Sequence, residues 1–164
     1  MTDREPIDPL TFGPDQQCFG CGPHNHTGMQ LQFFREGDAV VTTFLARDGW
    51  EGPPGIVHGG LQATLADEIG AWTLVGLRNR FGFTASANLR WLRPARTDRP
   101  VEARGQIVDD DDLSASVRVK LSQDGRTVLT GKIRYVYATI AQAERILGQP
   151  LPEAWHHLAR PTPE

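Results

Sequence analysis

Residues 52–68 read GPPGIVHGGLQATLADE and contain the start of the longest helix that the sequence predicts. Apolar side chains then recur at helical spacing at Leu61, Leu65, Ile69 and Trp72, and no proline interrupts the segment before Pro94. This helix is apolar around most of its circumference, so other elements must cover it on most sides. We therefore expect a long helix at the centre of the molecule.

Strand-like runs lie on both sides of this helix in the sequence. Two runs surround the turn REGD within residues 28–46, and four more occupy residues 83–92, 99–109, 113–122 and 127–138. Their spacing of about ten residues is typical of an antiparallel meander. The sequence thus predicts an α+β fold in which a curled antiparallel sheet of about six strands wraps around one long helix. Exposed edge strands of such a sheet favour pairing between two copies.

The chain of 164 residues has the length of one domain. Residues 1–17 are polar and hold three prolines, which predicts an irregular N-terminal arm. The main domain is expected over residues 18–140. A short helix and a proline-bearing tail are expected over residues 141–164.

Composition and charge exclude several functional classes. Hydrophobic residues make up 39% and charged residues 23% of the chain, and no apolar run approaches the roughly 18 residues that cross a bilayer. The net charge of −3 argues against a nucleic-acid-binding protein. The first residues do not resemble a secretory signal, so we expect a cytoplasmic protein that binds neither nucleic acid nor membrane.

The charge is unevenly distributed. Six arginines and one acidic residue, Asp98, lie within residues 78–99. Arginine presents a planar fork that suits phosphate, so this segment is either a binding surface for a small phosphorylated ligand or a solvated rim. Arg90, Arg93 and Arg96 are the candidates for phosphate binding.

Both cysteines lie in the motif CFGCG, as Cys18 and Cys21, with His24 and His26 close behind. These four residues are potential zinc ligands, but the spacing between the pairs is far shorter than in zinc fingers or ribbons. No strand–helix–strand context supports a thioredoxin-like redox site. We therefore expect a tight glycine-rich loop that packs two small thiols and holds no metal.

The helix start is suited to binding a negatively charged oxygen. The backbone N–H groups of Gly59 and Gly60 have no partner within the helix, and glycine lets a ligand approach closely. Removing one such donor from an oxyanion site typically costs about 3–4 kcal/mol of transition-state stabilisation. Gly59 and Gly60 are thus candidates for polarising a carbonyl group.

An acidic pair follows inside the helix. Asp67 lies seven residues after Gly60, which is about two turns, and small side chains surround it. Glu68 points about 100° away from Asp67, so it is either a charge on another helix face or a helper at the edge of the substrate site. Helical geometry therefore selects Asp67 as the reactive acid.

Three motifs together resemble a known family. They are GPPGIVHGGLQATLADE, in which an acidic residue follows the histidine by nine positions, TASANLRWLRPAR, and CFGCGPHNHTGMQLQF. Over about residues 18–138 the chain is similar to the hotdog-fold acyl-CoA thioesterases of the phenylacetate-pathway type, and within these to the thioesterase superfamily-member branch that acts on long-chain acyl-CoA. The chain departs from many members at Gly52, where they carry an asparagine or glutamine.

The resemblance implies a function and a set of site residues. Asp67 is implied as nucleophile or general base, the Gly59 N–H as oxyanion donor, His58 as a residue that orients the loop or binds near the thioester, and Thr84 of the partner subunit as a helper of the attacking water. It also implies a homodimer or dimer of dimers with the active site at the subunit interface, and CoA only as part of the substrate. A non-hydrolytic protein that binds acyl-CoA or an acyl carrier protein, and a structural subunit, stay open as alternatives.

Overall fold

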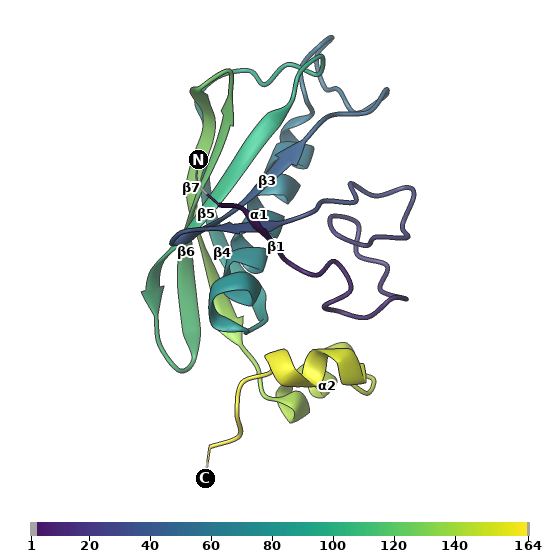
Figure 1. The fold of residues 1–164 in the computed structure, drawn as a ribbon, viewed down its shortest axis with the longest axis vertical. Helices are drawn as coiled ribbons and strands as arrows, with labels where there is room; N and C mark the ends of the chain where they lie inside the picture. The colour runs from purple at the N-terminus through teal and green to yellow at the C-terminus, as the bar shows by residue number, and fades with distance from the viewer. Residues whose placement is uncertain (1–2, 164) are drawn as a thin grey trace.

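The computed structural model describes residues 3–163, which form one antiparallel sheet curved around a long helix (Figure 1). In chain order, the elements are β1 Glu5–Pro6, β2 Phe34–Glu36, β3 Ala39–Phe44, α1 Gly59–Arg78, β4 Gly82–Trp91, β5 Val101–Asp110, β6 Ser114–Gln123, β7 Arg126–Tyr137, α2 Ile140–Leu147 and a 3-10 helix Glu153–Leu158. The predicted α+β architecture is confirmed, with seven strands in place of about six. The additional strand is the two-residue β1.

The strand order is β1-β2-β3-β5-β6-β7-β4, and neighbouring strands are antiparallel. The sheet stays open, with β1 at one edge and β4 at the other. The predicted meander is correct for β5, β6 and β7 but wrong for β4, which pairs with β7. After β3 the chain passes through α1 and returns to the sheet as β4, at the edge beside β7.

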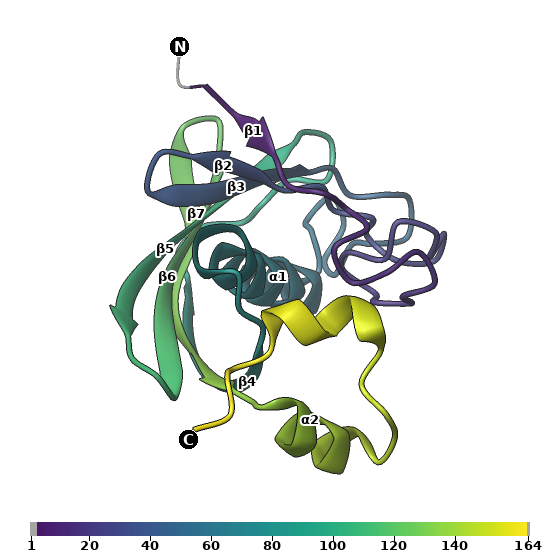
Figure 2. The same cartoon turned by 60° about the horizontal axis from the view of Figure 1, so that its bottom comes forward.

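The helix α1 lies in the concave side of the sheet (Figure 2). Leu65 and Ile69 of the helix are at most 1% exposed. On β6, Val117, Val119 and Leu121 are fully buried. The charged residues between them, Arg118 and Lys120, are exposed, so one face of β6 is buried and the other is not. Burial of this apolar surface is the main term that stabilises the fold.

The N-terminal arm and the C-terminal tail meet over the side of α1 that the sheet leaves open (Figure 2). Phe12 of the arm packs edge-on against Trp72 of α1, with 5.4 Å between ring centroids. The indole N–H of Trp155 in the tail donates a hydrogen bond to the Phe12 carbonyl at 3.0 Å. The arm is therefore more than a surface covering, because it contributes β1 and part of an aromatic cluster. Within residues 3–163, no helix has both the length and the apolar character that crossing a bilayer requires.

Candidate active site

The first turn of α1 is anchored by the loop before it. The Val57 N–H donates to the Ala95 carbonyl at 2.8 Å, and the His58 N–H donates to the Trp50 carbonyl at 3.0 Å. His58 caps the helix, since its Nδ1 accepts the Gly60 N–H at 2.9 Å. The expectation that both glycines present bare N–H groups is therefore wrong for Gly60.

The Gly59 N–H has no acceptor among residues 3–163. A Cβ placed on Gly59 would lie 3.7 Å from Nε1 of Trp91, at the end of β4, so the indole N–H lies close to this helix start. Trp91 is 50% exposed. The sequence reading did not include Trp91, because nothing in its local pattern relates β4 to the first turn of α1.

Asp67 faces β4 and β7. The Thr84 hydroxyl donates a hydrogen bond to Asp67 Oδ1 at 2.8 Å. The hydroxyl oxygen of the buried Tyr135 lies 2.9 Å from the Asp67 carbonyl oxygen and 3.3 Å from Oδ1. A Cβ on Gly70 would overlap this hydroxyl, so only glycine at this position lets the tyrosine approach. The small neighbours of Asp67 therefore make room for a tyrosine of the same chain.

Thr84 contacts Asp67 within a single chain. The expectation that Thr84 reaches Asp67 from a partner subunit is corrected by this contact. The strand order explains this contact. Because β4 pairs with β7, it passes beside the face of α1 that carries Asp67. The part that Thr84 plays in any reaction stays a prediction.

Gly59 and Asp67 lie at different heights on α1. Eight residues of helix separate them, which is about 12 Å at a rise of about 1.5 Å per residue. One carbonyl group cannot contact both the Gly59 N–H and the Asp67 carboxylate of the same chain. The Gly59 N–H and the Asp67 carboxylate therefore do not share a site within one chain.

Nearly half of the sequence matches a known family. Residues 54–130, from the loop before α1 to the middle of β7, match the family model described as thioesterase superfamily. Residues 54–130 belong to the thioesterase superfamily. The predicted family and its hotdog fold are thereby confirmed. No match to a curated protein was found.

Solved structures share the fold of this chain. A thioesterase superfamily protein is 24% identical with a TM-score of 0.68, over 80% of this chain and 66% of that one. A phenylacetic acid degradation-related protein of Ralstonia eutropha JMP134 is 24% identical with a TM-score of 0.60, over 66% and 85% of the two chains. A hypothetical thioesterase of Streptococcus pneumoniae TIGR4, solved with coenzyme A, is 24% identical with a TM-score of 0.56, over 60% and 81%.

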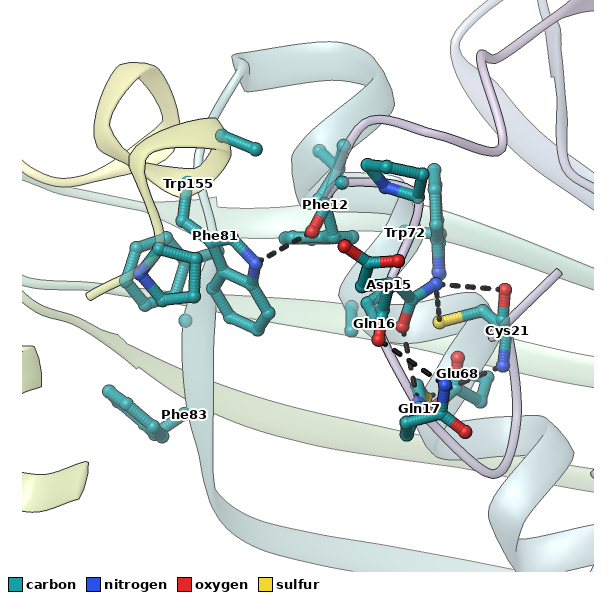
Figure 3. A pocket seen from close by; sticks show the side chains of 18 of the residues that line it. Phe12, Asp15, Gln16, Gln17, Cys21, Glu68, Trp72, Phe81, Phe83 and Trp155 are labelled. Carbon is teal, nitrogen blue, oxygen red and sulfur yellow. Dashed lines mark hydrogen bonds between the residues drawn. The ribbon is translucent and has the colours of Figure 1, made fainter. Parts of the chain in front are cut away.

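An apolar pocket of about 680 Å³ lies beside the Asp67 region of the thioesterase domain. Its aromatic walls come from the arm, α1, the start of β4 and the tail (Figure 3): Phe12, Trp72, Phe81, Phe83 and Trp155. Thr84 lines this pocket, and its hydroxyl is hydrogen-bonded to the Asp67 carboxylate. The sequence reading could not assemble these walls, because their residues are spread over more than 140 positions.

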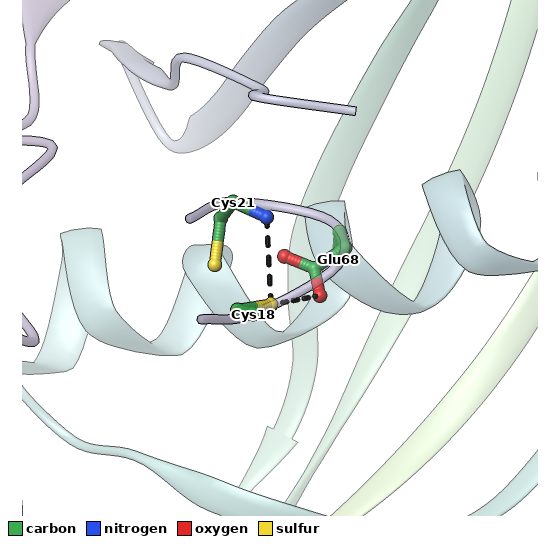
Figure 4. Close-up of side chains that lie close together, drawn as sticks. All are labelled: Cys18, Cys21 and Glu68. Carbon is green, nitrogen blue, oxygen red and sulfur yellow. Dashed lines mark hydrogen bonds between the residues drawn. The ribbon is translucent and has the colours of Figure 1, made fainter. Parts of the chain in front are cut away.

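Glu68 points away from Asp67 and toward the loop that carries the two cysteines (Figure 4). Its Oε1 lies 3.3 Å from Cys18 Sγ, and the Cys21 N–H donates to Cys18 Sγ at 3.4 Å. Hydrogen bonding from Cys21 lowers the pKa of the Cys18 thiol to about 5. The hydrogen bond with Cys18 and burial raise the pKa of Cys21, while burial and the charge of Cys18 raise the pKa of Glu68 to about 8. Glu68 thus belongs to a cysteine cluster that lines the apolar pocket.

The three candidate arginines of the thioesterase domain are placed differently. Arg93 and Arg96 line a pocket of about 500 Å³ near the loop before α1, whereas Arg90 lies exposed on β4 outside that pocket. Among residues 3–163, none of the three forms an ion pair with a carboxylate, while Arg78 and Arg99 do. Arg93 and Arg96 therefore keep their charges available, as phosphate binding would require.

Proposed function

We propose that the protein is an acyl-CoA thioesterase that hydrolyses the thioester bond of an acyl-CoA to a free acid and CoA. The observation that carries this proposal is the Asp67 carboxylate, held by the Thr84 hydroxyl next to an apolar pocket. A thioester carbonyl is electrophilic and a thiolate leaves readily. One oriented carboxylate and one oxyanion donor can therefore suffice without a full triad.

In this proposal, Asp67 either attacks the carbonyl carbon as a nucleophile or takes a proton from the attacking water. Thr84 orients the carboxylate or that water, and Tyr135 keeps Asp67 in position through its hydroxyl. The aromatic pocket accepts the apolar acyl group, whose burial supplies binding free energy. Glu68 lines the same pocket and contributes to its wall.

The oxyanion donor of this proposal is the Gly59 N–H of a second copy of the chain. Within one chain, the rise of the helix separates Gly59 from Asp67 by about 12 Å. The edge strand β4 offers a surface for pairing, since Trp91 and Leu92 are 50% and 46% exposed there. We propose a homodimer or dimer of dimers with the site between subunits. His58 would shape that site by capping Gly60 and leaving only the Gly59 N–H for substrate.

The CoA moiety would bind through its phosphates to Arg93 and Arg96, with Arg90 on the adjoining strand. The structural neighbour from Streptococcus pneumoniae was solved with coenzyme A, which supports this class of ligand. CoA enters only as part of the substrate.

The test is a hydrolysis assay with a panel of acyl-CoAs, in which a thiol reagent detects the released CoA. A trace without substrate subtracts the reaction of the protein's own two cysteines. We expect Asp67→Asn to lose about 100-fold or more in turnover, because general-base catalysis typically contributes 10²–10⁴-fold. Asp109→Asn, which changes an exposed carboxylate paired with Lys132, is the matched control and keeps the wild-type rate.

Two outcomes separate the alternatives. Turnover that survives both Asp67→Asn and Asp67→Ala at the wild-type rate contradicts the assigned role of Asp67. Absence of turnover on every acyl-CoA, combined with tight binding of CoA, favours a non-hydrolytic acyl-CoA or acyl-carrier-protein binding protein.

A further inference from the structure

The cysteine cluster formed by Cys18, Cys21 and Glu68 has the composition of a metal site. The two sulfur atoms and a Glu68 carboxylate oxygen all lie within 4.8 Å of one another (Figure 4). Zinc bonds of about 2.3 Å to sulfur and about 2.0–2.2 Å to oxygen place tetrahedral ligands about 3.5–3.8 Å apart. A small inward shift of the three side chains would therefore bring them to bonding distance of one ion.

The loop is shaped to support sulfur ligands. The Cys21 N–H donates to Cys18 Sγ, and Gln16 Nε2 lies 3.1 Å from the Cys21 carbonyl oxygen and 4.0 Å from Cys21 Sγ. N–H groups directed at sulfur stabilise thiolates, which are the form of cysteine that binds metals. The loop thus contains the hydrogen-bond donors that support thiolate ligands.

The Glu68 carboxylate lies close to the sulfur atoms of Cys18 and Cys21. A Cβ on Gly20 would overlap the Glu68 side chain, so the backbone between the two cysteines lies directly against the carboxylate. Within residues 3–163, no lysine, arginine or histidine forms an ion pair with Glu68. Among the described side chains, Cys18, Cys21 and Glu68 thus have no positively charged partner. A divalent cation would neutralise the negative charge of these three acidic groups.

We propose that Cys18, Cys21 and Glu68 bind a zinc-class divalent ion that ties the N-terminal loop to the middle of α1. Two thiolates and one carboxylate suit Zn²⁺ better than Mg²⁺ or Ca²⁺, which prefer oxygen ligands. All three residues line the apolar pocket, so water from that pocket can serve as the fourth ligand. On binding, the ion displaces the protons of the ligands into solution. This inference replaces the expectation of a metal-free loop and does not depend on the proposed function.

Cobalt is the probe for this site, because Co²⁺ bound to thiolates gives a sulfur-to-metal charge-transfer absorption. The full chain is reduced, freed of metal with a chelator and titrated with Co²⁺ and then with Zn²⁺. We expect one Co²⁺ per chain with the charge-transfer band, its displacement by Zn²⁺, and a higher melting temperature with Zn²⁺. Because the chain has only two cysteines, this band reports on Cys18 and Cys21 alone.

Variants test each ligand. Cys18→Ser and Cys21→Ser should weaken Co²⁺ binding by at least the 10–100-fold that losing a supporting partner typically costs. Glu68→Gln should keep a thiolate band and bind Co²⁺ more weakly. The double variant His24→Ala/His26→Ala is the control and should bind like wild type, since both histidines are exposed and outside the cluster.

Three results would overturn the proposal. The first is the absence of a thiolate band when the reduced wild-type protein is titrated with Co²⁺. The second is unchanged Co²⁺ affinity in Glu68→Gln, which would remove the carboxylate from the ligand set. The third is binding that disappears in the double histidine variant. All three are read on purified protein without acyl-CoA, so they are distinct from a failure of the thioesterase proposal.

Discussion

The two neighbouring acids of α1 have opposite surroundings. Asp67 faces the sheet, where the hydroxyls of Thr84 and Tyr135 lie within hydrogen-bond distance of it. Glu68 faces the N-terminal loop, where its partner is the sulfur of Cys18 and where burial raises its pKa to about 8. One residue, or about 100° of rotation around the helix axis, therefore separates the Asp67 carboxylate, which contacts hydroxyl groups, from the Glu68 carboxylate, which contacts a thiol. The partners that each face meets, rather than the acids themselves, are the basis on which we propose hydrolysis for Asp67 and metal binding for Glu68.

The strongest expected effect on stability comes from closing the space beside Asp67. Gly70→Ala should destabilise the protein by about 1–3 kcal/mol, because the new Cβ collides with the Tyr135 hydroxyl. Denaturant unfolding measures this change. Adding Tyr135→Phe removes the colliding oxygen, so the double variant should recover part of the stability. Equal stability of Gly70→Ala and wild type would contradict the close approach of the tyrosine.

The Thr84 hydroxyl, which is hydrogen-bonded to Asp67, can be removed with little change in the shape of the side chain. Thr84→Val should lower kcat by about 10- to 100-fold, since a hydrogen bond to a charged group is typically worth about 1.5–3 kcal/mol. Thr84→Ser keeps the hydroxyl and should restore most of the rate. Steady-state kinetics on one acyl-CoA distinguishes these variants. A Thr84→Val enzyme with the wild-type kcat would leave the threonine without a part in the reaction.

The cap at the start of α1 supports the shape of the site without touching Asp67. His58→Ala removes the acceptor of the Gly60 N–H and should cost about 1 kcal/mol of stability, as the loss of an N-cap typically does. His58→Asn supplies another capping acceptor and should be closer to wild type. Thermal unfolding of the three proteins is the measurement, and an unchanged melting temperature in His58→Ala would argue against the cap.

The smallest effects are expected at the arginines. Arg93→Gln and Arg96→Gln should each weaken CoA binding by about 2- to 5-fold at low salt, because exposed charge pairs contribute about 0.2–1 kcal/mol. Arg118→Gln is the matched control, since Arg118 is exposed on β6 and does not line that pocket. Calorimetry at two salt concentrations measures these changes. CoA affinity that is independent of salt would contradict phosphate binding by this surface.

Local periodicity predicted the parts of the fold that depend on neighbouring residues. The spacing of Leu65 and Ile69 located α1, and the alternation around Arg118 located β6. The position of β4 at the edge beside β7 had no local signal, because the order of strands is decided by packing over the whole chain. Helical geometry predicted that Asp67 and Glu68 point to different sides of the helix, and the two acids contact different elements.

The residues that contact Asp67 and Glu68 were harder to predict from the sequence. Gly70 indicated a close approach beside Asp67, but the approaching residue, Tyr135, is 68 positions after Asp67. Close to Cys18 in the sequence, the candidates for further ligands are Cys21, His24 and His26. Glu68 lies 50 positions further along the chain, and only the fold brings it to the cysteines.

The comparison between the two acids is tested most directly by kcat for Asp67→Asn and Glu68→Gln, measured side by side with wild type on the best acyl-CoA substrate. Both changes replace a carboxylate by an amide of nearly the same shape. We predict a loss of about 100-fold or more for Asp67→Asn and a loss of less than about 10-fold for Glu68→Gln. Equal losses, or a larger loss for Glu68→Gln, would contradict the assignment of hydrolysis to the Asp67 side of the helix.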